Sequence, residues 1–146
     1  MRLRFRHLGT LVVLALTLTR TAAAQSDEEK TPLGQRMSAM NAALRQITAQ
    51  VADPTKNAST LEQVVIFQTK ATEALTFKPE KTAQVAEGEQ EQFVADFQAG
   101  IKALLLKVDS LKVAVEDGRN EDAAKLVDDM KAWQREKHSV FRIRRP

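Results

Sequence analysis

Apolar residues recur every three or four positions along most of this chain, which is the spacing that places them on one face of an α-helix. Four such stretches, 32–51, 59–77, 89–117 and 120–141, are separated by polar breaks. The inward-facing positions that this spacing predicts are, stretch by stretch, Leu33, Met37, Met40, Leu44, Ile47 and Val51; Leu61, Val64, Val65, Gln68, Ala71 and Leu75; Phe93, Phe97, Ile101, Leu104, Val108, Leu111 and Val115; and Ala123, Val127, Met130, Gln134, His138 and Phe141. No strand-like alternation is present. The pattern predicts an all-α fold, an antiparallel up-down-up-down four-helix bundle.

Residues that favour helix ends lie at the breaks. Thr31, followed by a proline, is a typical N-cap of the first helix. Ser59 and Glu62 form the S-x-x-E spacing of a capping box for the second. Gly118 suits the end of the third helix because glycine adopts a left-handed conformation at little cost, and Asn120 is predicted to cap the fourth.

The N-terminal segment has the pattern of an export signal. A basic start is followed by about a dozen apolar residues and an A-x-A cleavage pattern. The apolar run is shorter than the ~20 residues that a spanning helix needs. We therefore predict a Sec-type signal peptide over 1–24, a polar leader over 25–31, the bundle over 32–142 and a basic tail over 143–146. The expected location is the periplasm, with no membrane span after cleavage.

Loss of residues 1–24 changes the charge. It removes four arginines, so that 18 basic residues stand against 19 acidic ones and the net charge becomes −1. A nucleic-acid-binding protein would need a clustered basic surface, so this class is not expected. The chain has no cysteine, one histidine outside the signal segment and no Glu-x-x-His motif. These features argue against a catalytic triad, a zinc cluster or a di-iron site.

Two side chains with metal-ligating atoms are expected at one end of the bundle. Met37 lies in the second turn of the first helix and His138 in the last turns of the fourth. In an up-down-up-down bundle these ends are adjacent, and both residues belong to inward-facing stripes. Haem iron accepts an axial histidine and an axial methionine. Because there is no Cys-x-x-Cys-His motif, a haem here would be bound without a covalent link.

Three stretches of the chain resemble the soluble periplasmic cytochrome b562 family: LGQRMSAMNAALRQI, DFQAGIKALLLKVDSL and MKAWQREKHSVFR. The resemblance covers nearly the whole chain after the signal segment. It implies that Met37 and His138 are the axial ligands, that Phe97 lines the haem pocket, and that Arg142 lies near the haem edge. It also makes Met40, the nearest alternative thioether, a wall of the pocket.

The chain departs from the family's pattern at several pocket positions. Gln134 replaces an arginine, Lys137 replaces an aromatic residue, and Ile101 replaces a second phenylalanine. Arg142 has two open interpretations, a partner for a haem propionate or a solvated arginine of the tail.

The sequence thus favours a periplasmic b-type haem protein that carries single electrons, with one non-covalent haem b and no enzymatic activity. Its redox partner would be an unidentified periplasmic protein. The alternative is a haem-free four-helix module with a structural or interaction role. A third interpretation keeps the haem but lets Met37 dissociate, which would open a site for a small gas or peroxide.

Overall fold

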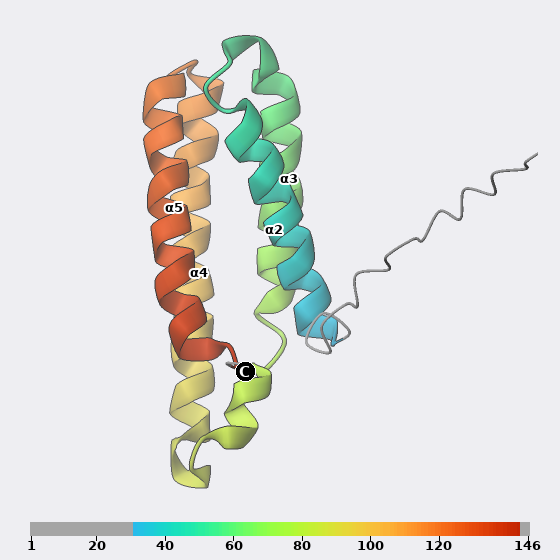
Figure 1. The fold of residues 1–146 in the computed structure, drawn as a ribbon, viewed down its shortest axis with the longest axis vertical. Helices are drawn as coiled ribbons and strands as arrows, with labels where there is room; N and C mark the ends of the chain where they lie inside the picture. The colour runs from blue at the N-terminus through green and yellow to red at the C-terminus, as the bar shows by residue number, and fades with distance from the viewer. Residues whose placement is uncertain (1–30, 144–146) are drawn as a thin grey trace, which may run out of the picture.

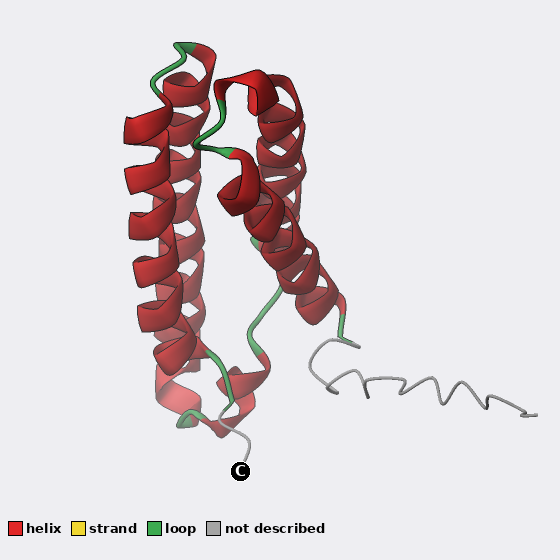
Figure 2. Cartoon of the chain, turned by 45° about the horizontal axis from the view of Figure 1, so that its top comes forward, coloured by secondary structure: helices red, strands yellow, loops and turns green. Residues whose placement is uncertain are grey.

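The structure is a computed structural model that describes residues 31–143; the predicted signal peptide, most of the leader and the last three residues lie outside this range. Within it there are four α-helices, three short 3-10 helices and no strand (Figure 2), so the predicted fold class is confirmed. No helix in the described range is both long and apolar enough to cross a membrane. The elements are α2 (Pro32–Gln50), η1 (Pro54–Lys56), α3 (Asn57–Ala74), η2 (Glu80–Gln84), η3 (Glu87–Glu89), α4 (Gln90–Glu116) and α5 (Asn120–Phe141).

The four helices form two antiparallel hairpins, α2 with α3 and α4 with α5 (Figure 1). The hairpins are packed together mainly through α3 and α4, whereas α2 and α5 are in close contact over only a short length. The segment between α3 and α4, which contains η2 and η3, passes below the end of α5 (Figure 1). As a result, the start of α2, the end of α5 and η2 lie at the same end of the bundle.

The core follows the predicted stripes closely in α4 and α5 and only in part in α3. The buried residues of α3 are Thr60, Val64, Phe67, Ala71 and Ala74. Val65, which we predicted to face the core, is 52% exposed. The prediction is confirmed for Val64 and Ala71 and is wrong for Val65, because Phe67 rather than Val65 is directed into the bundle.

Two predicted helix ends are confirmed by their hydrogen bonds. The Thr31 hydroxyl accepts a hydrogen bond from the Gly34 backbone N–H at 3.0 Å, which caps α2. Gly118 has a positive φ of 71°. The Arg119 N–H donates to the Ala114 carbonyl at 2.8 Å, and this bond closes the end of α4 as in a Schellman motif.

Two other predicted caps are wrong. Helix α3 begins at Asn57, so Ser59 lies inside it, and its hydroxyl donates to Gln50 Oε1 at 2.6 Å. Asn120 lies in the first turn of α5 and is 7% exposed. Its side-chain amide donates to the Val51 carbonyl and to Asn57 Oδ1, both at 2.7 Å. Asn120 therefore joins three helices at the end of the bundle opposite η2 instead of capping its own helix.

Candidate functional site

A cavity of about 380 Å³ lies where α2, α4, α5 and η2 meet. This volume is within the ~300–1,000 Å³ range of pockets that hold small molecules and cofactors. The residues that line it are Thr31, Leu33, Gly34, Met37, Ser38, Asn41, Arg45, Pro79, Glu80, Lys81, Phe97, His138, Phe141, Arg142 and Ile143. The cavity therefore includes four of the five residues that the sequence nominated for a cofactor.

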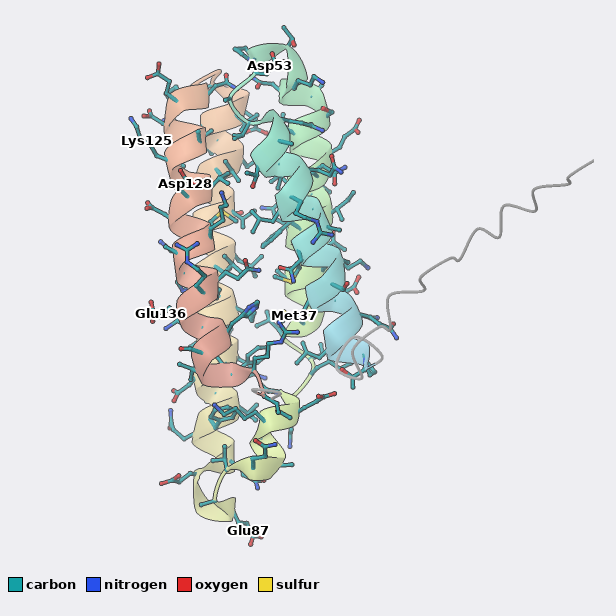
Figure 3. The ribbon with its side chains drawn as sticks, viewed as in Figure 1. Met37, Asp53, Glu87, Lys125, Asp128 and Glu136 are labelled. Atoms are coloured by element: carbon teal, nitrogen blue, oxygen red, sulfur yellow. The ribbon has the colours of Figure 1, made fainter. Side chains whose placement is uncertain are left out.

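Met37 and His138 reach this cavity from different helices. Met37 is a partly buried residue of α2 that packs against the core, on the side of α2 facing α5 (Figure 3). His138 lies in the last turn of α5 and is half-buried. The structure thus brings to one cavity a thioether and an imidazole that are about 100 residues apart in the sequence.

Aromatic rings form an apolar wall of the cavity. Phe97 is 6% exposed, and its ring lies 5.5 Å from that of Phe141 in an edge-to-face arrangement. Phe93 packs against the same Phe141 ring at 5.2 Å between centroids. The sequence identified Phe141 only as a core residue. Its position one turn after His138 on the same face of α5 was the signal that it would share the site.

Met40 lies elsewhere. It is 4% exposed within the hydrophobic core and is not among the residues that line the cavity. The next residue, Asn41, does line it and accepts a hydrogen bond from Gln134 Nε2, which joins α2 to α5. Gln134, which replaces an arginine of the family pattern, thus forms a neutral contact between these two helices.

Charged side chains surround the cavity. Arg45 belongs to α2, and Glu80 and Lys81 belong to η2. Arg142 is the residue that follows α5. Lys81 Nζ donates to the Val140 carbonyl and so holds η2 against α5. Cations outnumber anions among these four residues, which favours a ligand that carries carboxylates.

An ion-pair network fixes the first turns of α2 on α3. Arg36 Nε donates to one carboxylate oxygen of Glu73 at 3.0 Å, and Lys70 Nζ donates to the other at 2.8 Å. The pKa of Glu73 is lowered, most strongly by the hydrogen bond from Lys70 and further by Arg36. The Arg36 guanidinium also lies 5.4 Å from the centre of the Phe77 ring. Since Arg36 precedes Met37, these contacts restrain the backbone that carries the thioether.

A family model for cytochrome b562 matches residues 32–142, from the first residue of α2 to the residue after α5. The chain belongs to the cytochrome b562 family. A search of curated proteins found no match to it. The match covers both hairpins, so the cytochrome b562 assignment applies to the whole bundle and includes every helix that lines the cavity.

The lining of the cavity fits the haem b that the cytochrome b562 family implies. Met37 and His138 supply one donor atom each from two helices, and Phe97 and Phe141 supply a flat apolar surface. Within residues 31–143 no group of three or more histidine, aspartate or glutamate residues could hold a bare metal ion. Two donor atoms from separate helices suit an iron whose other ligands come from a macrocycle.

Proposed function

We propose that this protein is a periplasmic b-type haem protein that carries single electrons, with Met37 and His138 as the axial ligands. The observation that supports this most directly is that both side chains line one cavity from different helices. Membership of the cytochrome b562 family supports the haem and the electron-carrying role in general terms. The assignment of these two ligands rests on the cavity and on the sequence motifs.

Haem iron supplies one-electron redox chemistry when it is bound. Met37 and His138 would hold the haem through its iron, which would leave no open position for a substrate. Met37 and His138 belong to two long helices. The contact of Arg36 with Glu73 restrains the backbone of α2 beside Met37, and the contact of Lys81 with the Val140 carbonyl restrains the backbone of α5 near His138. Rigid donors need little rearrangement when the charge on the iron changes. This property suits electron transfer better than catalysis.

The remaining lining residues would hold the macrocycle and its carboxylates. Phe97 and Phe141 exclude water from one face of the cavity. Arg142 and Lys81 place positive charge at its rim, where a guanidinium or an ammonium can pair with a propionate. Because several lining residues are partly exposed, one edge of the haem would lie close to the surface. The redox partner, an unidentified periplasmic protein, would dock there.

Haemin titration of the purified protein, followed by visible spectroscopy in the oxidised and reduced forms, tests this proposal. We expect saturation at one haem per chain and a low-spin spectrum in both states. His138→Ala should abolish the low-spin spectrum, whereas Lys125→Ala, a change at a side chain that is 76% exposed and far from the cavity, should leave it intact. If the wild-type protein is helical by circular dichroism but binds no haemin, the haem-free module replaces the present proposal.

A further inference from the structure

A second, smaller hollow lies beside the cavity. It measures about 290 Å³ and is formed entirely by α2 and α5. Its lining residues are Asn41, Leu44, Arg45, Thr48, Lys131 and Gln134. Asn41 and Arg45 also line the main cavity, so the two spaces share a wall. A ligand that fills the main cavity can therefore present a substituent to the hollow.

The hollow is cationic. Arg45 and Lys131 line it, and its lining contains no carboxylate. Within residues 31–143 the side chain of Arg45 has no hydrogen bond or ion pair, and this exposed residue lies next to a space large enough for a polar group. Lys131 Nζ is 3.2 Å from Asp128, but the Asp128 side chain is 77% exposed, so this ion pair is weak. Both cations are thus available to an anion that enters the hollow.

The hollow lies to one side of the proposed ligand pair along the contact between α2 and α5. Arg45 follows Met37 by about two helical turns, a rise of roughly 12 Å. Lys131 precedes His138 by about the same rise on α5. Arg142 lies on the other side, one turn beyond His138. Cations therefore flank the ligand pair in both directions along these helices.

We propose that Arg45 and Lys131 form a carboxylate-binding site for one haem propionate. This inference rests on the proposed function, because it requires a haem in the main cavity. A guanidinium can bind a carboxylate through two parallel hydrogen bonds, and an ammonium adds a compact charge. Arg142, on the far side of the ligand pair, is left for the other propionate. The sequence alone assigned no role to Arg45 or Lys131.

A free anion or an acidic side chain of a partner could supply the same carboxylate. The shared wall favours the propionate, since Arg45 and Asn41 face the space that the haem would fill. A carboxylate delivered from the main cavity also needs no separate ligand to become ordered, so it loses less entropy on binding. An experiment can distinguish a haem propionate from a carboxylate that does not belong to the haem.

The test compares two ligands that differ only in their carboxylates. The dissociation constants of haemin and of its dimethyl ester are measured for the wild type, Arg45→Gln and Lys131→Gln. We expect each substitution to weaken haemin binding by roughly three- to tenfold and to change binding of the ester by less than about twofold. The matched control is Arg135→Gln, because Arg135 is an exposed residue of α5 that lines neither space. It should alter neither constant.

The outcomes separate this inference from the proposed function. Equal weakening of haemin and ester by Arg45→Gln, or no weakening of either, would overturn the propionate site while leaving the haem protein intact. If the wild type binds no haemin, both proposals fail. A succinate titration of the haem-loaded, reduced protein, followed by NMR, addresses the free anion. We expect no shift at Arg45, because a propionate already occupies the hollow, and a saturable shift there would overturn the assignment.

Discussion

At the scale of single residues, the site depends on which side chains reach the cavity rather than on which ones are buried. Met37 and Met40 belong to the same inward-facing stripe of α2, and only Met37 lines the cavity. Helical spacing predicted correctly that Met37 and His138 would lie at one end of the bundle. It could not separate two methionines one turn apart, because a shift of less than one turn in how α2 packs decides which of them faces the cavity.

Asn120 shows how much one buried polar residue contributes to the stability of the bundle. Its amide donates to the Val51 carbonyl and to Asn57 Oδ1, both at 2.7 Å. We predict that Asn120→Ala lowers the free energy of unfolding by about 1–3 kcal/mol, because a buried acceptor on Val51 and a partly buried acceptor on Asn57 lose their donor. Urea denaturation measures the change. Lys125→Ala, at a side chain that is 76% exposed, is the control and should stay within about 0.5 kcal/mol. An equal effect of the two substitutions would mean that the Asn120 hydrogen bonds contribute nothing.

Glu73 makes a pH-dependent contribution to the stability of the folded state. Its pKa is lowered by Lys70 and Arg36, so the folded state binds a proton at this carboxylate less readily than the unfolded chain does. The resulting stabilisation is present above the ordinary carboxyl pKa and is lost as the pH falls through the lowered one. We predict that Glu73→Gln lowers the urea midpoint at pH 7 and that this difference from the wild type shrinks in acid. Glu87→Gln, at an exposed carboxylate of η3, should show no such trend. A difference that grows toward low pH would contradict the assignment.

At the scale of helices, the turn from α4 to α5 depends on one glycine. Gly118 has a φ of 71°, and a Cβ at this position would meet no atom within 4 Å. We predict that Gly118→Ala lowers the free energy of unfolding by about 1 kcal/mol, entirely because alanine is unfavourable in the left-handed backbone conformation. The matched substitution is Gly100→Ala within α4. There the new Cβ would lie 3.6 Å from Trp133 Cζ2, an ordinary contact, and alanine favours the helix by up to about 1 kcal/mol. Thermal unfolding should shift in opposite directions for the two variants, and a shift in the same direction would contradict this account.

The helices differ in how far the sequence could predict them. In α4 the apolar residues recur at one spacing over 27 residues, so that both its bounds and its buried face were predicted closely. In α3 four apolar residues follow one another, Val64, Val65, Ile66 and Phe67. Because four consecutive residues go round about one full turn of a helix, their spacing does not indicate which face is buried. Contacts with α2 and α4 select Val64 and Phe67, while Val65 and Ile66 remain 52% and 43% exposed.

At the scale of the whole molecule, the two ends of the bundle differ. One end is closed by the Asn57–Asn120 contact, and the other contains the cavity and the adjoining cationic hollow. The sequence predicted the topology, since four amphipathic helices with short connections have few other arrangements. It could not predict the hollows, because they arise from the limited contact between α2 and α5, which depends on tertiary packing.

This asymmetry predicts where haem binding stabilises the protein. Hydrogen exchange should slow in the first turns of α2 and the last turns of α5, where Met37 and His138 lie. The free energy of opening there should rise by as much as about 2.7 kcal/mol at a free haem concentration of 100 times the dissociation constant. Amides next to Val51 and Asn120 should change less. Equal protection at both ends would show that haem acts on global unfolding alone, and protection confined to the Asn120 end would contradict the site.

We propose the Met37 sulfur and the His138 imidazole as the two axial ligands. The sharpest test is the spin state of bound haem in Met37→Leu beside Met40→Leu. Both substitutions keep the side-chain volume nearly constant and remove only a thioether. We predict low-spin haem in the wild type and in Met40→Leu, and a high-spin, five-coordinate haem held through His138 in Met37→Leu. A low-spin spectrum in Met37→Leu, or its loss in Met40→Leu, would contradict the account.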